Sequence, residues 1–109
     1  MRTRTERRRK RVYISGAITG HDLRERMTEF ERVEGFLRML GYEPVNPMRN
    51  GLPETATREQ HMKRDMAMLA TCDRIFMLKG WEKSEGAKLE LMVATACGMK
   101  VIIDTNFRF

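Results

Sequence analysis

Two carboxylates on otherwise apolar helix faces are the residues whose type and spacing could do chemistry. On a helical wheel of about 100° per residue, Glu90 falls near the middle of an apolar sector that also holds Ala94 and Cys97. A buried carboxylate is costly unless it is paired or put to use. The small residues Gly86 and Ala87 leave room beside it for a ligand or for close backbone packing. Glu90 is therefore a candidate site residue; the alternative is a glutamate that is salt-bridged to a core arginine or caps a neighbouring loop.

The preceding helix repeats this anomaly at Asp65. Met62, Met66 and Leu69 define the buried face of that helix, and Asp65 falls at the edge of the same apolar sector. From there its carboxylate could reach the crevice that holds Glu90. The alternative is a boundary carboxylate paired with an arginine. Two acids that converge on one cleft are the arrangement used in glycosidic chemistry.

The elements that position these acids alternate between strand and helix periodicities. The pattern predicts strands over 11–15, 42–45, 73–79 and 100–104 and helices over 22–40, 58–71 and 84–97. Gly41 and Gly98 are expected to end the first and third helices, and Thr57 to cap the second. Such alternation predicts an α/β fold, a Rossmann- or flavodoxin-like three-layer sandwich around a small parallel sheet of four to five strands. Ligands of such sheets bind beyond the carboxyl ends of the strands, here residues 15–20, 46–50, 79–86 and 104–106.

The first predicted helix has one apolar face. Its apolar residues recur at steps of three and four, at Leu23, Met27, Phe30, Val33, Leu37 and Leu40. We expect this face to pack against the sheet. The ten methionines of the chain fall mostly on such helix faces and are interpreted as core residues.

Composition excludes several classes of protein. A chain of 109 residues allows one domain of ordinary size, and no apolar run approaches the ~18–20 residues needed to cross a bilayer. Cys72 and Cys97 have no CxxC spacing, which is typical of buried, reduced cysteines in a cytoplasmic protein rather than of a disulfide framework or a zinc site. We therefore expect a cytoplasmic protein with no membrane association and no metal.

The positive charge is concentrated at the N-terminus. The chain has 21 basic and 15 acidic residues, a net of +6, and residues 1–11 alone hold seven basic groups and one acid. The remaining residues therefore have a net charge of zero, which argues against a domain that grips DNA through a broad positive face. We expect a basic, disordered tail over 1–11 and a single domain over 12–109. Such a tail could bind nucleic acid through counterion release, or it could be merely solvated.

Three further features give weaker signals. The segment from Gly16 to Gly20 follows the first strand, where nucleotide-binding folds hold phosphate, but it matches neither GxGxxG nor the P-loop. Trp81 precedes the third helix and could stack on a base, although a lone loop tryptophan is more often a packing residue. His21 and His61 fit no ligand or triad pattern, which favours solvated or capping roles.

Four segments together carry a family resemblance. They are YISGAITG (13–20), RDMAMLATCDRIFML (64–78), GWEKSEGA (80–87) and LELMVATACGMKVI (89–102). In order and spacing they resemble the nucleoside 2-deoxyribosyltransferase family and its relatives, the 2′-deoxynucleoside 5′-phosphate N-hydrolases. The resemblance covers residues 11–104, and it includes uncharacterised bacterial and phage members.

The resemblance implies a role for each matching residue. Glu90 matches the nucleophile, Asp65 the acid that holds the sugar or protonates the departing base, and Tyr13 the tyrosine that orients the nucleophile. The residues implied in substrate binding are Gly16, Ile18, Thr19, Gly20, Trp81, Ser84, Gly86 and Asn106. Ser84 matches a serine that helps hold the sugar or the 5′-phosphate. Two positions depart from the family: Thr19 replaces an arginine of some phosphate-selective relatives, and Leu91 replaces a glycine.

The resemblance also implies an activity and an assembly. The activity is cleavage or transfer at the N-glycosidic bond of 2′-deoxynucleosides or their 5′-monophosphates, without metal or cofactor. The family acts as homodimers or higher homo-oligomers in which a partner's C-terminal segment reaches the site, and Asn106 is the nearest polar candidate here. Two alternatives stay open: a nucleotide-binding module without turnover, and an accessory protein brought to nucleic acid by its basic tail.

Overall fold

The computed structural model describes residues 9–105, and Asn106 and most of the basic tail lie outside them. The strands are β1 (Arg11–Ser15), β2 (Glu43–Val45), β3 (Arg74–Met77) and β4 (Lys100–Ile103). The helices are α2 (Leu23–Met39), α3 (Arg58–Leu69) and α4 (Glu85–Ala96), with short 3-10 turns η1 (Pro47–Arg49) and η2 (Trp81–Lys83). The predicted order of elements is confirmed, and only their ends differ by a few residues.

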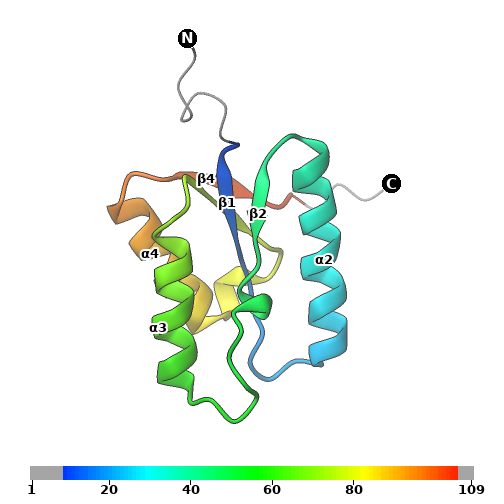
Figure 1. Cartoon of the computed structure of the whole chain (residues 1–109), viewed down its shortest axis with the longest axis vertical. Helices are drawn as coiled ribbons and strands as arrows, with labels where there is room; N and C mark the ends of the chain where they lie inside the picture. Colours follow the sequence, from blue (N-terminus) through cyan, green and yellow to red (C-terminus); the bar gives the residue numbers. More distant parts are fainter. Residues whose placement is uncertain (1–8, 106–109) are drawn as a thin grey trace.

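The four strands form one parallel sheet in the order β2-β1-β3-β4. Helix α2 covers one face of the sheet, and α3 and α4 cover the other (Figure 1). The predicted three-layer α/β sandwich is therefore confirmed, with four strands among the described residues. No helix in this part of the chain is long and apolar enough to cross a membrane.

Strand β1 runs through the middle of the sheet and divides its side chains between two cores. Successive residues of a strand point to opposite faces. Val12 and Ile14 therefore pack into the cluster beneath α2, while Tyr13 joins the cluster beneath α3 and α4. Ser15 is two residues beyond Tyr13, fully buried, and faces α4 as well. This register brings two hydroxyl groups to the layer that contains Glu90.

The helix boundaries follow the predicted capping residues. Thr57 and Gln60 form a capping box at the start of α3, with Thr57 Oγ1 accepting from the Gln60 amide at 3.1 Å. Gly41 and Gly98 follow α2 and α4 with φ angles of 89° and 73°, a conformation that favours glycine.

Several predicted core positions are wrong, among them the helix methionines Met39 and Met92, which are exposed. Leu23 and Leu40 are exposed, because one is the first residue of α2 and the other lies just beyond its end. Cys97 is exposed rather than buried, because it is the C-cap of α4, where the chain turns toward β4.

The middle of the predicted apolar face is buried in α2 and α4, whereas in α3 Met62 and Met66 are half-buried and only Leu69 is buried. Helical periodicity therefore locates a face, while the ends of the face depend on where the helix leaves the sheet.

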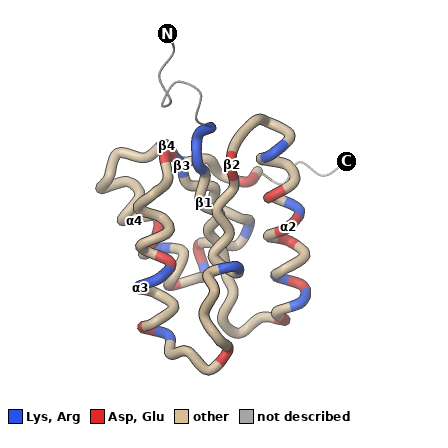
Figure 2. Tube along the Cα trace, viewed as in Figure 1, with Lys and Arg blue, Asp and Glu red and all other residues tan. Residues whose placement is uncertain are grey.

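Charges of both signs are interspersed along the helices (Figure 2). Several form ion pairs within or next to α2, such as Arg32 with Glu29 at 2.9 Å and with Asp104 at 3.1 Å. This mixture agrees with the zero net charge calculated for residues 12–109. The division into tail and domain stays a prediction, because residues 1–8 lie outside the described part of the chain.

Candidate active site

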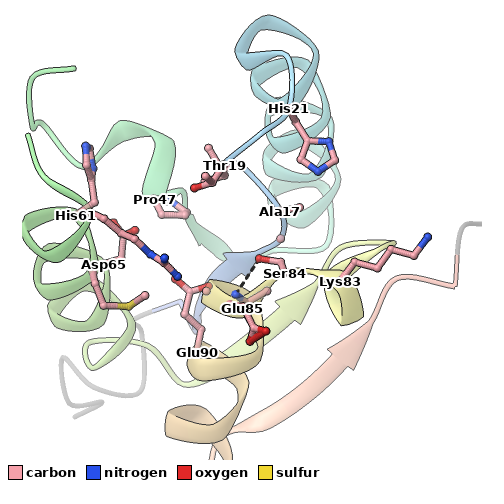
Figure 3. Close-up of a pocket in the computed structure, with 16 residues that line it drawn as sticks. Ala17, Thr19, His21, Pro47, His61, Asp65, Lys83, Ser84, Glu85 and Glu90 are labelled. Carbon is pink, nitrogen blue, oxygen red and sulfur yellow. Dashed lines mark hydrogen bonds between the residues drawn. The ribbon is translucent and has the colours of Figure 1, made fainter. Parts of the chain in front are cut away.

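A cavity of about 260 Å³ opens at the carboxyl ends of the strands. Its walls come from the loop after β1, from η1, from the first half of α3 and from the start of α4 (Figure 3). Glu90 and Asp65 both line it, as the two helix faces predicted. In Figure 3, Asp65 and His61 project from α3 on one side, and Ser84 and Lys83 lie on the other.

Both carboxylate oxygens of Glu90 accept hydrogen bonds from β1. The Tyr13 hydroxyl donates to Oε2 at 2.6 Å, and the Ser15 hydroxyl donates to Oε1 at 2.6 Å. Tyr13 and Ser15 are fully buried, and Glu90 is 6% exposed. No ion pair to Glu90 is formed by any residue in the described part of the chain, so the alternative of a core salt bridge is wrong. The carboxylate is held by two neutral donors.

This environment places the ionisation of Glu90 near neutral pH. Burial raises its pKa from 4.5 to about 7, and the hydrogen bonds from Ser15 and Tyr13 act in the opposite direction. The nearby charge of Asp65 adds a smaller upward effect. Burial and the charge of Glu90 raise the pKa of Tyr13 well above its ordinary value, so the phenol stays protonated and remains a donor. A carboxylate with these properties is an available nucleophile or base at neutral pH.

Asp65 is half-buried on the opposite wall. Its Oδ1 accepts a hydrogen bond from Asn50 Nδ2 at 2.9 Å, and none of the described residues forms an ion pair with it. No arginine within residues 9–105 therefore supplies the partner that the alternative requires. Burial raises its pKa, while the bond from Asn50 and the proximity of His61 lower it. A carboxyl group with a raised pKa is suited to proton transfer.

Two anchors hold the loops that form the walls. Arg26 of α2 is buried, and its Nε donates to the carbonyl oxygen of Ala17 at 2.7 Å, which fixes the loop after β1. Arg49 donates to both carboxylate oxygens of the buried Glu34, each at 2.9 Å, and Asn46 Nδ2 donates to the same group at 3.1 Å. The hydrogen bonds from Arg49 lower the pKa of Glu34. The segment after β2 is thereby tied to α2.

The residues predicted to bind substrate divide into three groups. Those that line the cavity are Gly16, Ile18, Thr19, Ser84 and Gly86. Gly20 lies beside the cavity in a turn with a φ of 83°, and Trp81 packs against the core beneath α3 and α4. This contact agrees with the packing alternative for Trp81, and the stacking on a base stays a prediction. Asn106 lies outside the described residues.

The structure explains why glycine occurs at position 16 and serine at position 84. A Cβ atom at position 16 would lie 2.7 Å from Cδ1 and 2.9 Å from Cβ of Leu78, so glycine permits the close approach of the loop to the end of β3. Ser84 is the N-cap of α4, and its hydroxyl accepts from the Ala87 amide at 3.1 Å. Both residues shape the wall next to Glu90.

The sequence did not identify several polar residues of the site. Ser15 could have been found from Tyr13, because residues two apart in a strand share a face. Asn50 ends the segment expected to face the ligand, and its amide contacts Asp65. His61 and His21 line the cavity, whereas solvated or capping roles were expected for both. No group of three or more potential metal ligands occurs within residues 9–105.

The site thus combines two acids of different environment around one cavity. Glu90 is buried, bound at both oxygens and ionises near neutrality, while Asp65 is more accessible and has one oxygen bound by an amide. The first suits attack on an electrophilic carbon, and the second suits donation of a proton to a leaving group.

Comparison with solved structures shows proteins that share this fold. The 2-deoxyribosyltransferase of the psychrotolerant bacterium Bacillus psychrosaccharolyticus has a TM-score of 0.68 at 21% identity, over 91% of this chain and 76% of that chain. The CMP N-glycosidase of Clostridium botulinum has a TM-score of 0.61 at 25% identity, over 86% of this chain and 70% of that chain. For the 2-deoxyribosyltransferase of Leishmania mexicana the TM-score is 0.68 at 20% identity, over 86% of this chain and 63% of that chain.

The sequence comparisons define the family. No curated protein matches the chain. The model of the family described as "Domain of unknown function (DUF4406)" matches residues 10–103, which is most of the chain. The resemblance inferred from the four sequence segments is confirmed by the solved structures that share the fold. The chain therefore belongs to the DUF4406 family, and its fold is that of nucleoside 2-deoxyribosyltransferase-like proteins.

Proposed function

We propose that this protein cleaves or transfers at the N-glycosidic bond of 2′-deoxynucleosides or their 5′-monophosphates, with Glu90 as the nucleophile. The observation that carries the proposal is the buried Glu90 carboxylate, bound at both oxygens by Tyr13 and Ser15 and open to a cavity. The activities named for the 2-deoxyribosyltransferases and the CMP N-glycosidase of similar fold support this choice of chemistry.

In the first step a Glu90 oxygen attacks the anomeric carbon. The C–N bond breaks, its electron pair leaves with the base, and a covalent deoxyribosyl-enzyme forms. The carboxylate also stabilises the positive charge that develops on the ring carbon and oxygen. Tyr13 and Ser15 hold the carboxylate in one orientation throughout, which reduces the entropic cost of attack.

Asp65 assists the departing base. Its raised pKa supports a role as proton donor to that base, and the alternative role is to hold the sugar. In the second step water or a second base attacks the same carbon and displaces Glu90. When water attacks, Asp65 accepts its proton, and the enzyme returns to its starting state.

The direct test is incubation with a panel of deoxynucleosides and their monophosphates, with free base followed by chromatography. Wild-type protein should release at least one base, and Glu90→Ala should lower the rate by more than about 100-fold while circular dichroism stays unchanged. If Glu90→Ala kept near-normal turnover, Glu90 would not be the nucleophile. Binding without base release by the wild-type protein would favour the alternative of a nucleotide-binding module without turnover.

We also infer that the protein acts as a homodimer or higher homo-oligomer. Large apolar side chains are exposed on α4 and β4, at Leu89, Met92, Val101 and Ile103. Exposed apolar groups of this kind are typical of protein interfaces. Light scattering after gel filtration should give a mass at least twice that of the chain, and a monomer at micromolar concentration would contradict the inference.

A further inference from the structure

The side chain of Asn50 connects three parts of the candidate site. Asn50 follows η1 and is buried. Its backbone carbonyl oxygen accepts a hydrogen bond from Nη1 of Arg64 of α3 at 3.0 Å. Its Oδ1 accepts from the Leu52 amide at 3.0 Å, and its Nδ2 donates to Asp65 Oδ1 at 2.9 Å. The same Nδ2 lies 3.0 Å from Nδ1 of His61. One buried amide therefore orients both an acid and an imidazole.

These contacts fix which end of the amide is the nitrogen. A backbone N–H can only donate, so the atom facing Leu52 must be the oxygen. A carboxylate oxygen accepts, so the atom facing Asp65 must be the NH₂ group. A flipped amide would place two donors against each other and two oxygens against each other. The orientation of Asn50 is thus set by two independent partners.

The tautomer of His61 follows from that orientation. An amide NH₂ group has no lone pair to offer, so Nδ1 of His61 must be the acceptor in their contact at 3.0 Å. The ring proton then resides on Nε2. Because Nδ1 is occupied, Nε2–H is the polar group that the ring can offer to a ligand.

The donor lies on the same wall as the acid. His61 and Asp65 are four residues apart on α3 and therefore share one face of the helix. Both line the cavity, and Figure 3 shows them together on the side opposite Ser84. This wall offers a ligand one N–H donor beside the second oxygen of a carboxyl group.

We propose that His61 and Asp65 form the base-binding wall of the site, in which His61 Nε2–H donates to an acceptor atom of the nucleobase and Asn50 is the positioning residue that fixes the ring. The inference rests on the proposed function, since it assigns the ligand of this wall as the base of a nucleoside. Its chemical class is a base with an unprotonated ring nitrogen facing α3. Negative charge accumulates on such an acceptor as the base departs, so the bond strengthens in the transition state.

The first experiment measures the tautomer of His61 without any ligand. Nitrogen NMR of the full-length, ¹⁵N-histidine-labelled protein at pH 8 should show a protonated Nε2 and an unprotonated Nδ1 for His61. Asn50→Ala should convert this signal to an average of both tautomers. A proton on Nδ1 in the wild-type protein would overturn the proposal.

The second experiment measures binding in the Glu90→Ala background, so that turnover does not interfere. His61→Phe keeps a planar ring without a donor, and His61→Gln is its matched control because the amide nitrogen replaces Nε2. The probes are 2′-deoxyadenosine and 2′-deoxycytidine, with deaza analogues that each lack one ring acceptor. Calorimetry should show that His61→Phe weakens binding of at least one parent nucleoside about three- to tenfold, while His61→Gln stays within about twofold.

The deaza analogues separate a contact from a structural effect. The analogue that lacks the recognised acceptor should bind His61→Phe as tightly as it binds the protein with His61. This is expected because the change in the enzyme and the change in the ligand remove the same hydrogen bond. Equal losses for the parents and all analogues, or no loss for either parent, would overturn the base-binding wall. Failure of the proposed function looks different: the wild-type protein would release no base, while the dependence of binding on His61 would persist.

Discussion

Replacement of Ser15 by alanine tests whether the two hydroxyls of β1 control the ionisation of Glu90. The change removes the hydrogen bond to Oε1 and leaves that of Tyr13 to Oε2. A hydrogen bond to a charged group contributes about 1.5–3 kcal/mol, and one pKa unit corresponds to about 1.4 kcal/mol. Since this bond opposes the effect of burial, its loss should raise the pKa of Glu90 by about one to two units.

The expected effect on activity depends on pH. At pH 7 a carboxyl group with a pKa of about 7 is about half ionised, whereas one with a pKa of about 8 to 9 is about 1–10% ionised. Base release by Ser15→Ala should therefore fall about 5- to 50-fold at pH 7. At pH 10 most of this loss should disappear, because both proteins then carry a largely ionised nucleophile.

The assay is kcat/KM for base release between pH 5 and pH 10, which reports the ionisation of Glu90 in the free enzyme. Thr28→Ala is a matched control, because it removes a hydroxyl on the exposed side of α2 that does not line the cavity. Tyr13→Phe should shift the profile in the same direction as Ser15→Ala. A Ser15→Ala profile that keeps the wild-type midpoint, with a uniform loss at every pH, would refute the argument that Ser15 stabilises the ionised form.

Three other outcomes are expected. Because burial raises the pKa of Glu90 in the folded state from 4.5 to about 7, the stability of the wild-type protein should fall as pH rises through this window. The free energy of unfolding of Glu90→Gln, measured in urea, should therefore exceed that of the wild type by up to about 3 kcal/mol at pH 8 and differ little from it at pH 4. Asp65→Asn should lower base release by ~10²–10⁴-fold for bases that need protonation and by less for easily departing bases; an equal loss for all bases would indicate sugar binding, and an unchanged series would exclude Asp65 from the site. Deletion of residues 1–10 should leave base release nearly unchanged but abolish salt-dependent binding to DNA, and salt-sensitive binding by the truncated protein would contradict the separation of tail and domain.

The sequence could predict those site residues that interrupt the regular apolar spacing of a helix. Glu90 was identifiable because a carboxylate interrupts an apolar face, and the fold because strand and helix periods alternate. Tyr13 came from the family resemblance alone. Ser15 shares a strand face with Tyr13, and its contact with Glu90 could have been inferred only from the placement of Tyr13 beside the same carboxylate.

The remaining residues depend on the path of irregular segments. Asn50 lies in the segment between β2 and α3, which has no period from which its contacts could be read. His61 acquires a role only because that segment folds back against α3 and places an amide beside its ring. Cys97 was wrongly predicted to be buried, because the helical wheel extends the apolar face beyond Ala96, the residue at which the helix ends.

The close approach of Gly16 to Leu78 limits how this sequence can change. A single methyl group at position 16 would overlap the Cδ1 and Cβ atoms of Leu78, which is fully buried. Gly16→Ala alone should therefore be lost from a mutational library selected for folded protein, and of all residues at position 78 only glycine, which has no Cβ atom, would remove both overlaps. Ordinary substitutions at position 78 therefore cannot compensate for a side chain at position 16, and the loop beside Glu90 should keep its glycine as the rest of the sequence diverges.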